Sequence, residues 1–216
     1  MAKKSTRNTR GKIIDAAWKL FYRQGYDDTT VEEIIEGSGT SRGSFYHYFP
    51  GKDGLLSTLA DVFDQKYEEL MENIDPEMDR FDQLMYLNRE LFAMIESAIS
   101  LDLLARLYSS QLVTRGDKSL LDQGRTYYKL LRQIALQGQA RGELRTDVTA
   151  NEVVRAYALC ERALIYDWCL SGGDWSLTQY ARTMMPMFLQ GFRAGAPCPY
   201  RGIPCAPDKT LSERTK

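Results

Sequence analysis

The sequence predicts an all-α protein in which a small N-terminal helical domain precedes a larger helical domain. Apolar residues recur every three to four positions through most of the 216 residues, which is the period of a helix that buries one face. No segment alternates apolar and polar residues as a half-buried strand would. Capping residues, glycines and prolines divide the periodic pattern into about nine helices.

The composition favours a globular protein and argues against a membrane protein. The hydrophobic fraction is 44%, and no apolar run reaches the roughly 20 residues that a membrane-spanning helix needs. The basic start of the chain is not followed by the apolar stretch of a signal peptide. We therefore expect a cytoplasmic protein without a membrane partner.

The charge does not by itself identify a nucleic-acid partner. The net charge is −1, and the segment up to Leu55 holds nine basic and seven acidic residues. Such a weak asymmetry attracts no polyanion on its own. Any argument for a nucleic-acid partner must therefore rest on where individual residues lie.

No metal site or cofactor is predicted. The chain has four cysteines, none of them in a Cys-x-x-Cys pair, and one histidine, His47. A zinc site needs a cluster of such residues, and reduced thiols are expected in a cytosolic protein. The cysteines are Cys160 and Cys169, expected as small apolar core residues of a helix, and Cys198 and Cys205 near the C-terminus.

Local signals delimit three helices at the N-terminus. Gly25 can end the first, whose apolar face includes Ile13 and Phe21. Thr30-x-x-Glu33 is a capping box that opens a short second helix, which ends at Gly37-Ser38-Gly39. Ser41 can cap a short third helix that runs to about Phe49. Two short helices around a glycine-containing turn predict a helix-turn-helix.

The remaining chain is also predicted to be helical. Lys52 starts a long helix that ends before Pro76, and Thr149 or Asn151 can cap a later one. Pro186 should kink or split the last helix. The other predicted helices cover 80–97, 101–111, 120–138, 151–170 and 176–195. We expect a DNA-binding domain at 1–55, a larger helical domain at 56–195 and a disordered, proline-rich tail at 196–216.

The predicted third helix has the chemistry of a DNA reader. Phe45 and Phe49 are four residues apart and can anchor the helix to the core. Arg42 can donate two hydrogen bonds to a guanine, and Ser44 can contact base edges or phosphate. Tyr46, His47 and Tyr48 can donate to phosphate oxygens, as can Lys52 at the start of the next helix.

Two other interpretations of this helix are weaker. Adjacent aromatic residues are often merely packed, but the polar side chains around Tyr46 and Tyr48 favour an exposed surface. His47 as a catalytic base would need an arranged acid or nucleophile, and none lies near it in the sequence. We therefore do not expect an enzyme.

The N-terminal segment resembles the DNA-binding domain of TetR-family transcriptional regulators. The resemblance spans about Thr9 to Leu59, and it is most specific in the Phe-Tyr-x-Tyr-Phe-x-x-Lys sequence that ends at Lys52. It implies a homodimer whose third helix enters the major groove of a palindromic operator, so double-stranded DNA is the expected partner. The DNA-binding residues expected from the sequence and this resemblance are Thr30, Ser41, Arg42, Gly43, Ser44, Tyr46, His47, Tyr48 and Lys52.

The sequence departs from the family pattern at four positions. Ser38 and Thr40 flank the turn glycine where alanine and valine are common, and Gly51 replaces a serine cap before Lys52. These changes should cost little. Glu32 occupies a position that is often basic in relatives, which argues against a DNA contact by the second helix.

The resemblance also implies how two copies would pair. The segment 140–148 looks like the family's link to its dimerisation helices, so 151–171 and 176–195 would form a four-helix bundle with their symmetry mates. The sequence supports this because the helix over 151–170 is apolar on more than one face. Such an interface would set the spacing of two reading helices.

Family members usually bind a small molecule between the helices that follow the DNA-binding domain. A pocket rich in aromatic residues would suit a mostly apolar ligand with one polar end. The alternative is that these residues lie on the surface or form ion pairs, for example with Glu90, Glu96 or Glu161. The candidate ligand-binding residues are Arg89, Phe92, Tyr108, Tyr128, Arg162 and Tyr166, and Tyr86, Met94, Gln111 and Tyr127 are further candidates.

The predicted function is a dimeric transcriptional regulator, specifically a repressor that a small ligand releases from its operator. An alternative is a DNA-binding dimer without an inducer, acting as an architectural or division-linked factor. A helical enzyme would need a cluster of titratable residues in the larger domain, and the sequence offers none.

Overall fold

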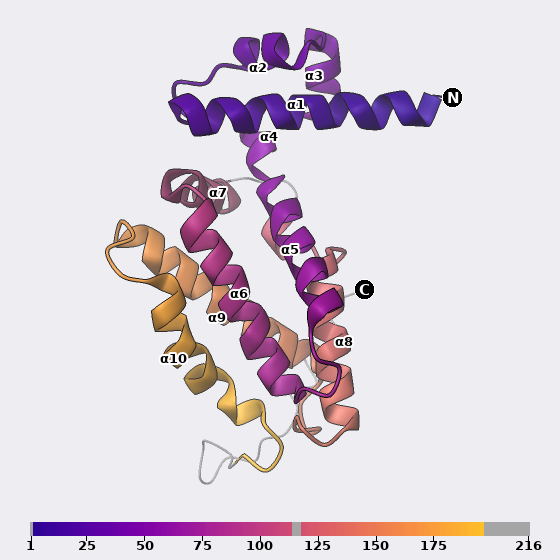
Figure 1. Cartoon of the computed structure of the whole chain (residues 1–216), viewed down its shortest axis with the longest axis vertical. Coiled ribbons are helices and arrows are strands. Elements are labelled where there is room, and N and C mark those ends of the chain that lie inside the picture. The colour runs from indigo at the N-terminus through magenta and orange to yellow at the C-terminus, as the bar shows by residue number, and fades with distance from the viewer. Residues whose placement is uncertain (1, 114–117, 197–216) are drawn as a thin grey trace. The chain divides into compact units, whose positions relative to one another are not determined.

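The computed structural model describes residues 2–113 and 118–196 of the chain. The predicted tail lies outside the described residues except for Ala196, and so do Cys198 and Cys205. Within the described ranges every regular element is helical and no β-strand occurs, which confirms the all-α prediction (Figure 1). None of the described helices combines the length and the apolar character that a bilayer crossing requires.

The helices follow one another closely along the chain. The α-helices are α1 (Ala2–Gln24), α2 (Val31–Ser38), α3 (Arg42–Tyr48), α4 (Lys52–Leu56), α5 (Leu59–Asn73), α6 (Arg80–Ala98), α7 (Leu101–Val113), α8 (Thr126–Ala140), α9 (Ala150–Leu170) and α10 (Leu177–Leu189). Two short 3-10 helices, η1 (Ser119–Leu121) and η2 (Gln190–Phe192), precede α8 and follow α10.

The chain forms two compact units, each made of two segments of the sequence. The first unit spans Met1–Gln65 together with Ala98–Asp122, and the second spans Lys66–Ser97 together with Gln123–Lys216. The segment that holds α7 therefore belongs to the N-terminal unit. In that unit Tyr22 donates from its hydroxyl to the carbonyl of Ala98, and Arg106 of α7 forms an ion pair with Asp27.

The first unit is organised around α1. Helices α2 and α3 lie along one side of α1 (Figure 1), and the apolar face of α1 is buried at Ile13, Ala17 and Phe21. Phe45 of α3 and Phe49, which follows it, are also buried, with ring centroids 6.0 Å apart. The predicted anchoring pair of the third helix is thus confirmed.

The prediction of one long helix that starts at Lys52 and ends before Pro76 is wrong, because a turn at residues 57 and 58 separates α4 from α5. The Ser57 hydroxyl donates to the Gly54 carbonyl at 2.6 Å, and the Thr58 hydroxyl donates to the Leu55 carbonyl at 2.6 Å. Thr58 also accepts from the Trp18 indole N–H of α1 at 3.0 Å. Hydroxyl groups that bond to the local backbone compete with helix continuation, and Trp18 holds Thr58 in that geometry.

The end of the chain also differs from the sequence prediction. Helix α8 begins at Thr126 rather than near residue 120, after the 3-10 turn η1. Pro186 lies inside α10, which ends at Leu189, several residues before the predicted end. The segment after α10 then pairs with the predicted connector, since Arg145 N–H donates to the Phe192 carbonyl at 3.0 Å.

Of the two predicted caps of α9, the structure uses Thr149. Its hydroxyl oxygen accepts from the Glu152 N–H at 3.2 Å, and the Glu152 carboxylate accepts from the Thr149 N–H at 2.6 Å. This reciprocal arrangement satisfies two donors at the start of the helix.

Gly138 of α8 marks a close approach in the second unit. A Cβ at this position would lie 2.7 Å from Leu144 Cδ1 and 3.0 Å from Arg80 Cβ, and both neighbours are buried. Gly138→Ala should therefore lower the free energy of unfolding by about 1–3 kcal/mol, although alanine is the better helix former.

The matched control is Gly11→Ala within α1, where a Cβ meets nothing within 4 Å. This variant should raise the free energy of unfolding by up to about 1 kcal/mol. Urea denaturation of both variants measures the difference. Equal stabilisation by the two substitutions would show that α8 does not need glycine for packing.

Candidate functional site

The second helix of the helix-turn-helix starts at a complete capping box. The Thr30 hydroxyl oxygen accepts from the Glu33 N–H at 3.2 Å, and the Glu33 carboxylate accepts from the Thr30 N–H at 2.8 Å. The hydroxyl of Thr30 donates to the same carboxylate at 2.9 Å. Hydrogen bonds from the backbone of Thr30, and then from the side chains of Gln24 and Thr30, lower the pKa of Glu33. The carboxylate therefore stays ionised at the helix start, where the helix dipole favours it.

The turn between α2 and α3 uses both of the unusual residues that flank its glycine. Gly39 has φ +61°, the left-handed conformation that glycine adopts without strain. The Ser38 hydroxyl donates to the Ile35 carbonyl at 3.0 Å and shares a 2.7 Å hydrogen bond with the Thr40 hydroxyl. Ser38 and Thr40, the two residues that depart from the family pattern here, thus satisfy each other's hydroxyl groups by a hydrogen bond.

Helix α3 presents one polar face outward. Ser41 caps the helix by accepting from the Ser44 N–H at 3.1 Å, as predicted. The predicted DNA-binding residues from 41 to 48 all lie on this short element while Phe45 faces the core. The exposed members are Ser41, Arg42, Gly43, Tyr46 and His47, and the half-buried members are Ser44 and Tyr48.

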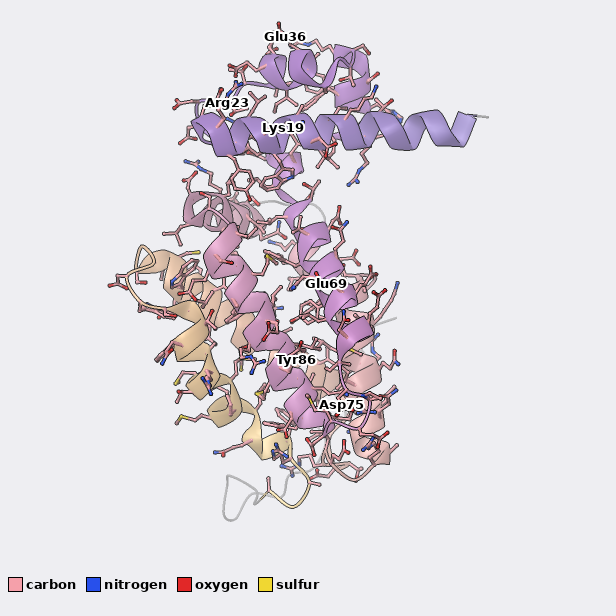
Figure 2. The ribbon with its side chains drawn as sticks, in the orientation of Figure 1. Lys19, Arg23, Glu36, Glu69, Asp75 and Tyr86 are labelled. Atoms are coloured by element: carbon pink, nitrogen blue, oxygen red, sulfur yellow. The ribbon has the colours of Figure 1, made fainter. Side chains whose placement is uncertain are left out.

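Arg42 is held between α2 and its own helix. Its guanidinium lies 3.1 Å from the Glu32 carboxylate and 5.6 Å from the centre of the Tyr46 ring. The side chain is still 68% exposed, so the pair contributes little to stability. Glu36, the last acidic residue of α2, projects from the helix without a described ion pair (Figure 2).

Gly43 has no structural reason to be glycine within this chain. It lies inside α3, its φ is not positive, and a Cβ there would meet only the Ser41 hydroxyl, at 3.9 Å. A glycine within a helix costs about 1 kcal/mol relative to alanine. The residue therefore lowers stability at an exposed position without any packing benefit.

Lys52 begins α4, as predicted, and its ammonium is bound within the protein. Its ammonium donates to three backbone carbonyls of the α1–α2 turn, those of Tyr26 at 2.6 Å, Thr29 at 2.8 Å and Asp27 at 3.3 Å. It also lies 4.3 Å from the centre of the Tyr26 ring. An ammonium group has three donors, so Lys52 is engaged within the protein and ties α4 to the turn before α2.

The six candidate ligand-binding residues are distributed over both compact units. Tyr108 belongs to the first unit and the other five to the second. Arg89 forms a 2.8 Å ion pair with Glu90 and is about half exposed, as the surface interpretation predicted. Tyr166 is exposed, whereas Phe92 and Tyr128 are buried. Arg162 donates to the Tyr128 hydroxyl at 3.1 Å.

A buried polar cluster that was not predicted lies in the second unit. Glu161 of α9, only 4% exposed, accepts from Asn88 of α6 at 2.9 Å, from Tyr67 of α5 at 3.0 Å and from Tyr127 of α8 at 2.7 Å. Tyr157, one turn before Glu161, lies 3.5 Å from the Tyr67 hydroxyl and donates to the Leu84 carbonyl at 3.0 Å. We call Glu161, Asn88, Tyr67, Tyr127 and Tyr157 the Glu161 cluster.

Burial controls the ionisation of the cluster. Desolvation raises the pKa of Glu161, and the hydrogen bonds from Asn88, Tyr127, Tyr67 and Tyr157 lower it by less. The same burial, together with the nearby carboxylate, raises the pKa of the three tyrosines. One signal in the sequence pointed to this site. Glu161 lies four residues after Tyr157, on the face of α9 that the apolar pattern assigns to the core.

The described residues were also compared for possible metal ligands. Across residues 2–113 and 118–196, no three His, Cys, Asp or Glu side chains lie close enough to hold a metal ion.

In comparison with known proteins, the helix-turn-helix region matches a described protein family. Residues 13–59 match the family model described as bacterial regulatory proteins, tetR family. These residues comprise the second half of α1, all of α2 to α4 and the first residue of α5.

Curated relatives extend the match. The chain is 32% identical over 100 residues to the probable HTH-type transcriptional regulator ArpR of Pseudomonas putida, across 46% of this chain and 47% of ArpR. It thus spans about half the length of that relative. It is 27% identical over 189 residues to the HTH-type transcriptional regulator HbdR of Aromatoleum sp. strain CIB, across 85% of this chain and 80% of HbdR. Both are named as regulators of transcription rather than as enzymes.

Solved structures share the fold over nearly the whole chain. The FadR repressor of Thermus thermophilus superposes with a TM-score of 0.70 at 22% identity, across 90% of this chain and all of that one. The arrangement of a helix-turn-helix followed by a larger set of helices is common to both. At 22% identity this likeness shows a shared fold, while the match of residues 13–59 to the tetR family model shows that these residues resemble the family's helix-turn-helix.

Proposed function

We propose that this protein is a DNA-binding regulator of transcription that reads a palindromic operator with α3. The observation that carries the proposal is the exposed polar face of α3, which is fixed to the core by Phe45 and Phe49. The match of residues 13–59 to the tetR family model supports it. As a regulator of bacterial genes it would act in the cytoplasm.

Each residue on this face has a role that its chemistry allows. Arg42 can leave the exposed Glu32 carboxylate and donate to the two acceptors of a guanine, since a solvent-exposed ion pair is weak. Ser44 would contact base edges. Tyr46, His47 and Tyr48 would donate to phosphates and fix the register, with Thr30 and Ser41 at the helix starts as further phosphate contacts.

The glycine at position 43 supports a close approach of DNA. Because no atom of the chain crowds this position, the absence of a side chain benefits only a partner that comes near the backbone of α3. A helix that enters the major groove brings such a partner to its exposed face.

For Lys52 we propose a positioning role in place of the phosphate contact expected from the sequence. Its three hydrogen bonds hold the start of α4 against the turn that precedes α2. A phosphate could be bound only if at least one of these bonds were given up. The residue would therefore act on DNA binding through the placement of the helices.

A homodimer through α9 and α10 is supported by an exposed apolar stripe. Leu159, Ala163, Tyr166 and Leu170 lie at intervals of three or four residues along α9, and all are exposed. Met187 and Phe188 are exposed on α10. We assign this surface, including Tyr166, to a second copy of the chain, because a contiguous apolar surface of this kind is typical of interfaces.

The finer part of the proposal is a repressor that a small, mostly apolar molecule releases from DNA. The FadR structure from Thermus thermophilus, described as a repressor, contains lauroyl-CoA, which supports a small-molecule effector here. Selection of bound fragments from random DNA, repeated with candidate effectors, tests both parts. Failure to enrich any palindrome would refute the regulator proposal.

Substitution of Arg42 tests the reading of bases. Arg42→Ala should weaken operator binding by about 1–3 kcal/mol and relax the preference at one base pair, because the bidentate contact is lost. Arg42→Lys keeps the charge, so it should retain the salt dependence of binding but not the base preference. Unchanged affinity and preference in both variants would place α3 outside the groove.

Substitution of Gly43 tests the close approach. Gly43→Ala should raise the free energy of unfolding by up to about 1 kcal/mol and yet weaken operator binding at least fivefold, since the methyl group faces the partner. Gly37→Ala in α2 is the matched control, because a Cβ there would make an ordinary 3.7 Å contact with Ala16. It should leave DNA binding unchanged. Equal operator affinity for the two variants contradicts the role given to Gly43.

Substitution of Leu159 tests the dimer. Leu159→Glu places a charge in the middle of the α9 stripe and should shift sedimentation from dimer to monomer, with loss of tight binding to a two-half-site operator. Leu136→Glu is the control, since Leu136 is comparably exposed, at 54% against 60%, but lies on α8. A Leu159→Glu protein that remains dimeric would exclude this surface as the interface.

A further inference from the structure

We infer that Glu32 is a specificity-determining residue of this regulator, because it neutralises Arg42 and thereby directs that side chain to a guanine rather than to a phosphate. The inference rests on the proposed function, in which α3 reads an operator, and it deepens that function by naming a residue of α2 that controls the choice of sequence. Glu32 acts through Arg42 and needs no contact with DNA.

Glu32 and Arg42 meet on the outer surface of the helix-turn-helix. The guanidinium Nη1 lies 3.1 Å from the Glu32 carboxylate, and the two side chains are 65% and 68% exposed. Glu32 is the second residue of α2, and Arg42 is the first residue of α3. Each helix of the motif thus supplies one member of the pair, and the cation proposed to read a base has a carboxylate beside it.

The ion pair leaves enough of Arg42 free to read a base. A guanidinium carries five N–H donors in one plane, and the contact with Glu32 is made by Nη1. The Tyr46 ring centre lies 5.6 Å from the guanidinium carbon, and an aromatic face attracts the charge without occupying all of these donors. Arg42 can leave Glu32 when it binds, but a guanine needs only two donors and does not require it to leave.

The charge of the pair distinguishes the two kinds of acceptor on DNA. The O6 and N7 atoms of a guanine are neutral acceptors, so an arginine whose charge is balanced can still donate to them. A phosphate is an anion, and binding to it depends on positive charge that displaces counterions. The Glu32 carboxylate repels a phosphate that approaches Arg42, and the pair carries no net charge. The pair therefore favours a guanine over a phosphate.

This preference raises specificity by weakening the wrong complexes. Specificity is a difference between affinities, so disfavouring other sequences increases it as effectively as strengthening the operator complex. Contacts to phosphates carry no information about sequence. Without Glu32, Arg42 would add such a contact on any DNA. An exposed ion pair changes an equilibrium constant by up to about fivefold, which sets the size of the effect in each subunit.

Glu36 provides a matched control on the same helix. It is exposed, as Glu32 is, and it has no ion pair among the described residues (Figure 2). Glu33 is unsuitable, because its carboxylate accepts from the Thr30 N–H in the capping box. Glu32→Gln and Glu36→Gln remove the same charge from α2, and only Glu32→Gln changes the charge balance at Arg42.

Binding of the full-length variants to the selected operator and to random-sequence DNA, over a range of salt concentrations, tests the inference. Glu32→Gln should lower the ratio of operator affinity to random-DNA affinity by about threefold or more relative to Glu36→Gln. It should also steepen the salt dependence on random DNA by about one phosphate contact per subunit. Equal affinity ratios, or equal salt slopes, for the two variants would overturn the inference.

The same substitutions in the Arg42→Ala protein show whether Glu32 acts through Arg42. In this background Glu32→Gln and Glu36→Gln should have equal effects on both DNAs, because no guanidinium remains to be neutralised. A difference between them that persists without Arg42 would mean that Glu32 acts on DNA directly, and it would refute the role given to the pair.

The effect of Arg42→Ala alone separates this inference from the proposed function. If Arg42→Ala weakens operator binding while the two glutamine variants behave alike, the role of Glu32 is refuted and the reading of the operator by α3 stands. If no palindrome is enriched, or if Arg42→Ala leaves operator binding unchanged, the proposed function fails and the inference fails with it.

Discussion

A helix of seven residues cannot hold itself together in water, and the reading surface of this protein is such a helix. The burial of Phe45 and Phe49 is what keeps α3 in place. Ser41 satisfies a backbone donor at its start, and Lys52 ties the following helix to the turn before α2. Apart from the Ser41 cap and the exposed Arg42–Glu32 ion pair, the outward face of α3 adds little to the stability of the helix. It is free to hold residues chosen for a partner.

The two glycines at positions 43 and 138 illustrate this division between structure and partner. Gly138 is required by the chain itself, since Leu144 and Arg80 occupy the space that a side chain would need. Gly43 has open space around it, so the chain would tolerate a side chain there. Glycine is unfavourable inside a helix at both positions. At Gly138 it is explained by internal packing, and at Gly43 it points to an external surface.

The parts of the fold that could be predicted depend on neighbours in the sequence. The caps at Thr30, Ser41 and Thr149 act over three residues, so the sequence placed the starts of α2 and α3 and narrowed the start of α9 to two candidate caps. The break after α4 depends on Trp18, which lies 40 positions before Thr58, and no local pattern could reveal it. The carbonyls bound by Lys52 are similarly remote, so the sequence could not reveal that its ammonium donates to the turn before α2.

The Glu161 cluster could not be assembled from the sequence for the same reason, as its partners come from three other helices. A lone acid on the apolar face of a helix is nevertheless a readable conflict between pattern and chemistry. Such conflicts cost stability and persist where function needs them. In a chain with a net charge of only −1, function must depend on where single charges lie. Arg42 is exposed and only weakly paired, so it can leave Glu32 for a base. Glu161 is buried among neutral side chains, so its ionisation depends on the hydrogen bonds that Asn88, Tyr67 and Tyr127 donate to it.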